Sequence, residues 1–170
     1  MKITPSEELI LAGCNEGSEH ALQELSEKIA APVYGFLSSS LGKNAGSAHD
    51  LFIEAFICGI RNSLSENTPI LVKVLSRLIH DISKLPFDKK VLILPENVSI
   101  RAQIILRTLS YMSWNDRVLV LLRDQLDLSH EEMSAVLSMN EHVIKMHLTE
   151  ARIHFRNYLN EVLKKCEGLA

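Results

Sequence analysis

The side chains best suited to chemistry in this chain are polar and basic groups that recur along one predicted helix near its C-terminal end. Over residues 141–156 they fall three or four positions apart, the spacing that puts residues on one face of a helix. Lys and Arg bind phosphate oxygens, while hydroxyl, imidazole and apolar groups can contact base edges in a groove. The candidate DNA-binding residues are His142, Lys145, Met146, Thr149, Arg152 and Arg156.

Two helices around a tight turn are expected to position this face. Ser129, followed three residues later by Glu132, has the pattern of a capping box that begins the first helix. Residues 138–140 then form the turn, and Asn140 is a suitable N-cap for the second helix. The layout is that of a helix-turn-helix, whose second helix enters the major groove. The apolar positions of the second helix form one inward stripe: Ile144, Leu148, Ala151 and Phe155.

Other features of the same segment favour a different interpretation. Helices joined by a short turn are common in ordinary bundles. Residues 129–156 contain three Lys or Arg and four Asp or Glu, whereas phosphate binding is favoured by an excess of basic residues. Met146 and Ile153 lie on the outward face, and exposed apolar side chains there are typical of a surface that a protein partner covers. A protein-binding role for this face therefore remains open.

The composition limits the fold and the partners. With 170 residues the chain is long enough for one or two small domains. Aromatic residues make up only 5%, and the aliphatic runs suit packed helices better than a β-sandwich. The formal net charge of −3 excludes a polybasic coat for nucleic acid, although it leaves room for a local basic face.

No arrangement of residues indicates an enzyme, a cofactor or a metal centre. There is no glycine-rich phosphate loop, no nucleophile elbow and no pair of catalytic carboxylates. The His residues lack the spacing of metal ligands. Cys14, Cys58 and Cys166 are too far apart for a disulfide framework, which favours a reducing cytoplasm. No signal peptide or membrane-length apolar run is apparent, so we expect a cytoplasmic protein without membrane insertion.

Helix-start patterns recur through the rest of the chain and predict an all-α fold of roughly eight helices in two groups of four. They occur at Thr4, Ser18, Ser47 and Ser113, each followed by apolar residues at helical spacing. Residues 85–98 differ, because two prolines bracket them. We therefore predict two small helical domains joined by a linker. Their boundaries are 1–84, 85–98 for the linker, and 99–170.

In this order the motifs resemble those of bacterial RNA polymerase sigma factors of the sigma-70 family, in the small extracytoplasmic-function (ECF) group. Residues 9–25 are similar to the opening of region two, and residues 48–56 to its acidic helix. Residues 106–122 and 128–137, with the helix that ends in Ala151-Arg152, resemble region four. The likeness covers nearly the whole chain, and region four is its more specific half.

The resemblance implies two binding surfaces and no catalysis. The region-two-like domain would bind the RNA polymerase core, and the matching positions are Asp50, Leu51, Glu54 and Phe56. The region-four-like helix-turn-helix would bind promoter DNA through the six residues named above. An anti-sigma factor is a further possible partner.

Several positions depart from the family pattern and predict weaker DNA contacts. Residues 48–84 contain four basic and four acidic residues, without the basic run that usually follows region two. The replaced positions are Ile53 (usually Gln), Val74 and Asp81 (near the usual Trp and Asn), Ser138 (usually Gly), and His147 and Glu150 (commonly basic).

Two functional hypotheses follow from these observations. The first is an ECF-type sigma factor that directs RNA polymerase to promoters, and we prefer it because the helix-turn-helix and the likeness along the chain are intact. The second is a sigma-like interaction protein that binds an anti-sigma factor or another regulator and has little DNA binding of its own. An unrelated helix-turn-helix repressor would explain the N-terminal half poorly.

Overall fold

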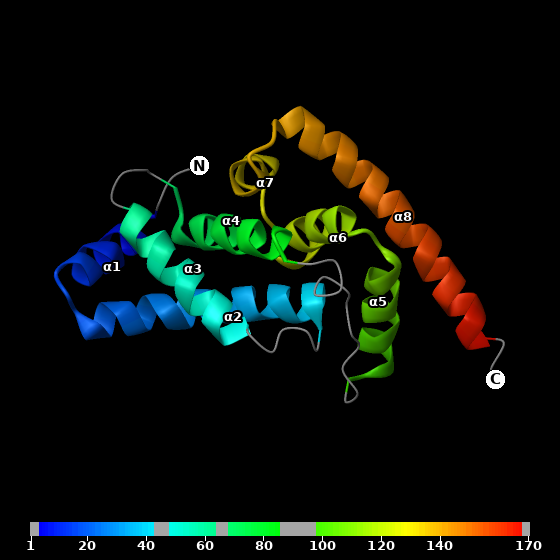
Figure 1. Ribbon diagram of the computed structural model, residues 1–170, viewed down its shortest axis with the longest axis horizontal. Coiled ribbons are helices and arrows are strands. Elements are labelled where there is room, and N and C mark those ends of the chain that lie inside the picture. Colours follow the sequence, from blue (N-terminus) through cyan, green and yellow to red (C-terminus); the bar gives the residue numbers. More distant parts are fainter. Residues whose placement is uncertain (1–3, 43–47, 64–67, 86–97, 168–170) are drawn as a thin grey trace.

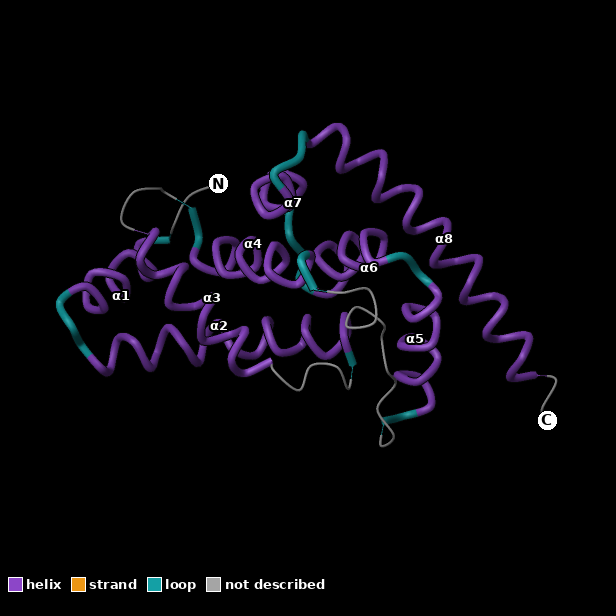
Figure 2. Tube along the Cα trace, in the orientation of Figure 1, coloured by secondary structure: helices purple, strands orange, loops and turns teal. Residues whose placement is uncertain are grey.

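The computed structural model describes residues 4–42, 48–85 without 64–67, and 98–167 (Figure 1). Its described residues form eight α-helices and one π-helical turn (Figure 2), so the predicted all-α fold is confirmed. The N-terminal group is α1 (Pro5–Asn15), α2 (Glu19–Leu41), α3 (Ala48–Ser63) and α4 (Ile70–Ser83). The C-terminal group is α5 (Ile100–Tyr111), α6 (Trp114–Val120), η3 (Leu121–Gln125), α7 (His130–Leu137) and α8 (Glu141–Glu167).

Most helices begin where the sequence places a cap. The hydroxyl oxygen of Thr4 accepts a hydrogen bond from the backbone of Glu7 at 3.3 Å, and Ser18 and Ser113 cap α2 and α6 in the same way. At Gly42, φ is +57°, a backbone conformation that suits glycine and ends α2. The cap expected at Ser47 lies outside the described residues.

Helix α4 has a cap that comes from a distant part of the chain. Its N-cap position is Pro69, which makes no side-chain capping hydrogen bond. Instead, the carboxylate of Glu7 in α1 accepts a hydrogen bond from the backbone of Ile70 at 2.8 Å. A carboxylate at a helix N-terminus satisfies a free N–H group and interacts favourably with the helix dipole. This contact ties the first helix of the chain to the fourth.

The helix expected to run from Ser113 to Leu126 changes character in its second half. Its last turn is the π-helical η3, which widens the helix from Leu121 onward. The four consecutive side chains of residues 119–122 are all buried, because α6 and η3 pack against α2 on one side while α6 packs against α8 on another. A helix that is covered on several sides cannot show the one-sided pattern from which its form would be read.

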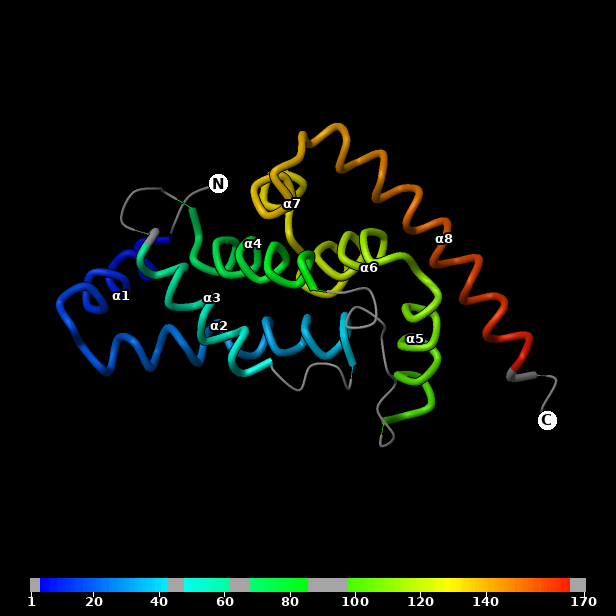
Figure 3. Tube along the Cα trace, viewed as in Figure 1, coloured from blue at the N-terminus to red at the C-terminus, as the bar shows by residue number. Residues whose placement is uncertain are grey.

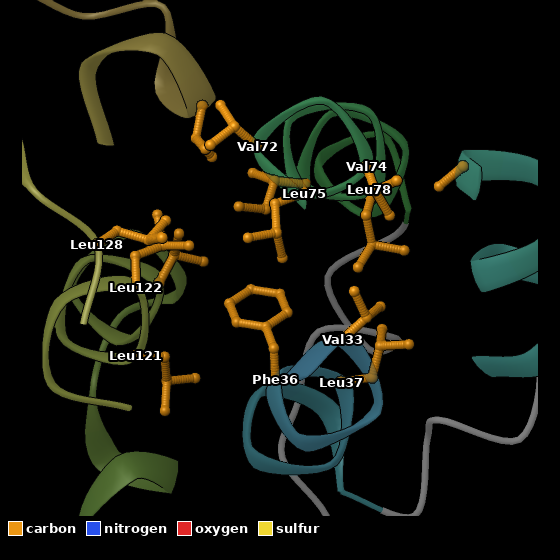
Figure 4. Packing of buried hydrophobic residues seen from close by; sticks show 14 of the residues in the cluster. Val33, Phe36, Leu37, Val72, Val74, Leu75, Leu78, Leu121, Leu122 and Leu128 are labelled. Atoms are coloured by element: carbon orange, nitrogen blue, oxygen red, sulfur yellow. The ribbon is translucent and has the colours of Figure 1, made fainter. Parts of the chain in front are cut away.

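The two groups of helices share one hydrophobic core (Figure 4). Phe36 of α2 and Leu75 of α4 are fully buried and lie opposite Leu122, which is also fully buried. In addition, α4 packs against α7, the first helix of the helix-turn-helix. Most of the predicted linker, residues 86–97, lies outside the described residues, so the domain boundaries stay a prediction. The described parts of the two halves are nevertheless in extensive contact, and we call this contact surface the seam.

Arg117 of α6 connects the halves across the seam. Its guanidinium is 3% exposed and donates to the carbonyl oxygens of Ser40 at 2.6 Å, Leu109 at 3.0 Å and Met112 at 3.2 Å. These carbonyls lie at the C-terminal ends of α2 and α5, where a cation is favourable. Burial lowers the pKa of Arg117 to about 10, so the side chain stays charged at neutral pH. No sequence pattern indicated a role for Arg117.

Replacing Arg117 should therefore destabilise the whole chain. Arg117→Met keeps the apolar stem and removes the donors, which leaves buried carbonyls without their partner. We expect the free energy of unfolding to fall by about 2–4 kcal/mol, measured by urea denaturation. Arg107→Met, at an exposed arginine of α5, is the matched control and should change it by less than about 0.5 kcal/mol. Equal stability of the two variants would show that the seam does not depend on Arg117.

Candidate nucleic-acid interface

The helix-turn-helix is built as its sequence indicates. Ser129 and Glu132 form the reciprocal capping box that starts α7. The side-chain oxygen of Asn140 accepts a hydrogen bond from the backbone of His142 at 2.8 Å, at the start of α8. Ser138 takes the left-handed conformation at φ +52°, which a glycine would adopt with less strain. Fully buried Met133 and Ile144 hold the two helices together.

All six candidate DNA-binding residues are exposed on α8. This helix runs along one edge of the molecule, and much of its length borders solvent (Figure 3). From His142 to Thr149 the helix advances about 10 Å, which fits within a major groove about 12 Å wide. Arg156 lies roughly another 10 Å along the axis, where it is better placed for phosphates than for base edges. The structure thus gathers the six residues on one accessible surface.

Nearby carboxylates compensate much of the positive charge on this surface. Lys145 is 3.8 Å from Glu141, and His147 is 3.5 Å from Glu150. Arg152 makes two hydrogen bonds to Asp124 of η3, and this contact raises the pKa of Arg152. Such half-exposed pairs are weak, and a phosphate could compete for the cation. DNA binding by this helix is therefore expected to be weak on its own.

Among the described residues, Arg156 is the candidate cation that forms no ion pair. Thr149 also has a partner within the helix, because its hydroxyl donates to the carbonyl of Lys145 at 2.8 Å. Beside these groups, Met146 and Ile153 are 52% and 50% exposed and lie seven residues apart on the same face. The α8 surface therefore combines basic and apolar side chains.

A second candidate surface lies on α3, where the sequence predicts the polymerase contact. Asp50 and Glu54 are exposed and Leu51 is half-buried. Phe56 is only 7% exposed and its ring stacks on Phe52, with 5.5 Å between the ring centroids. Phe56 therefore supports this face from within the core, and the structure does not bring it to the surface with Asp50 and Glu54.

Two apolar side chains are exposed on the same face of α3: Ile53, named above only as a departure from the family pattern, and Ile57, which no sequence pattern singled out. Ile53 and Ile57 are 39% and 44% exposed and lie one helical turn apart, beside Asp50 and Glu54. The sequence signal available for this pair was their spacing, which places two apolar residues on the polar face of an amphipathic helix. Glu54 is also held by Arg77 of α4, 3.6 Å away.

The helix that follows offers little to DNA. In α4, Val74 stands near the position where the sigma-factor pattern usually has Trp. Its side chain is fully buried. Asp81 is paired with Arg77 at 2.6 Å, and α7 packs against the same helix. Within the ranges that the structure describes, no three His, Cys, Asp or Glu side chains are placed to hold a metal ion. None of the described helices is long and apolar enough to span a membrane.

Comparison with known protein families identifies the C-terminal half. Residues 102–155 match the family described as Sigma-70, region 4. The match begins in α5 and ends within α8, so it contains α7, the turn and the first part of α8. This part of the chain is therefore similar to sigma-70 region 4, in agreement with the resemblance of its motifs. The comparison with curated protein sequences found no match.

Comparison with solved structures extends the likeness to both halves. The chain is similar to the structure titled as a co-crystal of the sigma factor RpoE in complex with the anti-sigma factor NepR from Bartonella quintana. The TM-score is 0.61 at 19% identity, over 84% of this chain and 96% of that chain. The predicted resemblance is thus confirmed by sequence for region four, and for the chain as a whole at the level of fold.

The charge arrangement on α8 makes the salt dependence of DNA binding a direct test. With Lys145 and Arg152 paired, we expect the full chain to make only two or three phosphate contacts. The slope of log affinity against log salt should then be roughly −2 to −3, measured by fluorescence anisotropy on duplex DNA. Arg156→Gln should make the slope shallower by about 0.9. A slope steeper than about −5 would contradict the compensation described above.

Proposed function

We propose that this chain is an ECF-type sigma factor that binds the RNA polymerase core and directs it to promoters. The observation that carries the proposal is the exposed face of α8 in a helix-turn-helix. Five of its six candidate residues lie inside the span that matches sigma-70 region 4, and Arg156 directly follows that span. In this role the protein binds and positions other molecules and needs no catalytic group, metal or cofactor. Its place of action would be the cytoplasm.

In the proposed complex, α8 enters the major groove of the promoter. His142, Lys145, Met146 and Thr149 would face base edges, because they occupy the N-terminal turns of the recognition helix. Arg156 would bind a phosphate and help to fix the register, since phosphate contacts position a protein and base contacts specify the sequence. Because the surface carries so little free positive charge, tight promoter binding would need the polymerase.

The polymerase contact is assigned to the exposed face of α3. Asp50, Ile53, Glu54 and Ile57 present two carboxylates and two apolar side chains to one partner surface. This mixture suits a protein interface better than DNA, because carboxylates would repel phosphates. We keep the proposed division into a polymerase-binding domain 1–84, a linker 85–98 and a DNA-binding domain 99–170.

One observation favours a second function. Met146 and Ile153 are exposed on the α8 surface, where the neighbouring cations Lys145 and Arg152 are already paired with carboxylates. A sigma-like interaction protein would use this α8 surface for a regulatory protein such as an anti-sigma factor, and would need little affinity for DNA. The structural relative was crystallised with an anti-sigma factor, which is compatible with this alternative.

Transcription in vitro would distinguish a sigma factor from a sigma-like interaction protein. Purified core polymerase would be incubated with the full chain and a genomic DNA library, and the transcripts sequenced. The proposal predicts transcripts that start at a shared sequence motif and disappear without the chain. Absence of specific transcripts despite stable binding of a regulatory protein would favour the interaction protein.

Binding to core polymerase should depend on α3. Asp50→Ala and Ile57→Ala should each weaken binding several-fold, because they remove a charged and an apolar contact, while the melting temperature changes little at these exposed sites. Co-purification with core and surface plasmon resonance would measure this. Leu9→Ala, at a 75% exposed leucine of α1, is the control and should bind like the wild type. Equal binding by all three variants would remove α3 from the interface.

DNA binding should respond to charge on α8 in a position-dependent way. Glu150→Arg should strengthen binding to every duplex, because it adds a phosphate contact and not a base contact. Glu161→Arg adds the same charge three turns further on and is the matched control, with a smaller expected effect. Lys145→Ala should weaken binding by about 1–3 kcal/mol if it contacts a base edge, and should relax specificity at one position.

Gel shifts on a promoter fragment and on unrelated duplexes would measure these effects. If all variants bind every duplex with the wild-type affinity, α8 does not touch DNA. The exposed Met146 and Ile153 would then be assigned to a protein partner.

A further inference from the structure

A cavity of about 380 Å³ opens on the C-terminal side of the seam. Its walls come from α5, the junction of α6 with η3, and α8, and Ser39 of α2 completes it from the N-terminal half. None of the residues proposed to bind polymerase lines it. Of the proposed DNA-binding residues, only Arg152 does.

The floor of the cavity is apolar and belongs to the core. Leu109, Val120 and Leu121 line it and are 2–6% exposed. Ile105, which is 43% exposed, and Leu106 lie nearer the opening. Walls of this kind and a volume of this size are typical of sites that bind small apolar molecules, which gain free energy by leaving water.

Charged groups lie at one end of the cavity. Arg152 and Asp124 both line it, and their side chains are 49% and 42% exposed. Asp124 accepts hydrogen bonds from the Nε and one Nη of Arg152. A guanidinium has five N–H donors in a planar fork, so donors remain for a second carboxylate. The site thus offers apolar walls and, beside them, a guanidinium that is paired with one carboxylate and has donors left for another.

We propose that this cavity binds an amphiphilic carboxylate, whose aliphatic chain lies on the apolar floor and whose carboxylate is held by Arg152. An anionic head group is assigned because both oxygens of Asp124 are already engaged by Arg152, whereas Arg152 keeps N–H donors that can bind a second carboxylate. Because α2 contributes Ser39, a ligand in the cavity contacts both halves of the chain and stabilises the seam by mass action. This inference does not depend on the proposed binding of polymerase or promoter DNA.

Sodium decanoate, used below its micellar concentration, is a suitable probe, and decylammonium chloride has the same chain with the opposite charge. The proposal predicts that decanoate raises the melting temperature of the full chain by several degrees and binds at one site in calorimetry. Decylammonium should bind at least tenfold more weakly. Equal binding of both would show unspecific uptake of amphiphiles, and no binding of decanoate would show that the cavity is not a ligand site.

Two pairs of variants test the place of binding. Ser39→Phe should fill the cavity from α2 and abolish binding, whereas Ser38→Phe, on the neighbouring exposed position of the same helix, should leave it unchanged. Arg152→Gln should remove the preference for decanoate over decylammonium. Lys164→Gln removes one positive charge elsewhere on α8 and should not affect that preference.

Asp124→Asn distinguishes a ligand-binding Arg152 from a purely structural one. It breaks the same ion pair as Arg152→Gln but keeps the cation and frees its donors. The proposal predicts that Asp124→Asn binds decanoate several-fold more tightly than the wild type, while Arg152→Gln binds it more weakly. If both variants lose affinity equally, the pair only supports the fold and the proposal is wrong.

Discussion

The seam between the two groups of helices depends on one buried cation and the apolar side chains around it. Arg117 is held by backbone carbonyls at the ends of α2 and α5, and these helices belong to different halves of the chain. An arginine in such a place is costly to bury unless its donors find partners, and helix ends provide carbonyls together with a favourable dipole. Phe36 and Leu122 are buried in the core that the two halves share at the same seam.

The seam fixes the position of the two proposed binding surfaces relative to each other. The α3 face lies in the N-terminal group and the α8 face at the opposite edge of the C-terminal group (Figure 1). Since α4 packs against α7, the helix-turn-helix is held directly on the region-two-like half. Polymerase and promoter would then meet a preformed arrangement of surfaces, without the entropy cost of ordering two freely linked domains.

Local chemistry explains which parts of the fold could be predicted from the sequence. Caps such as Ser18, Ser113 and Ser129 act within three residues, and apolar stripes such as that of α8 follow the helical period, so both can be read along the chain. The exposed α8 face was predictable for the same reason. The resemblance then suggested the function proposed for this face, which periodicity alone leaves open.

The features that were missed depend on residues far apart in the sequence. Glu7 caps a helix that begins 63 residues later, and Arg117 reaches Ser40 across 77 residues. The partner of Arg152, Asp124, lies in another element, so the compensation of charge on α8 could not be read from α8 alone. The π-helical turn follows from packing on several sides, which erases the one-sided pattern.

Because they share the seam, the two halves of the chain should unfold as one cooperative unit, and Phe36→Ala tests this. Trp114 of α6 is the only tryptophan, so its fluorescence reports the C-terminal half. Phe36 lies in α2 of the other half, and its truncation should lower the stability by about 3–5 kcal/mol. The urea transition of Trp114 should then shift by the full amount and coincide with the loss of helical circular dichroism. A Trp114 transition unchanged by Phe36→Ala would show instead that the halves unfold independently.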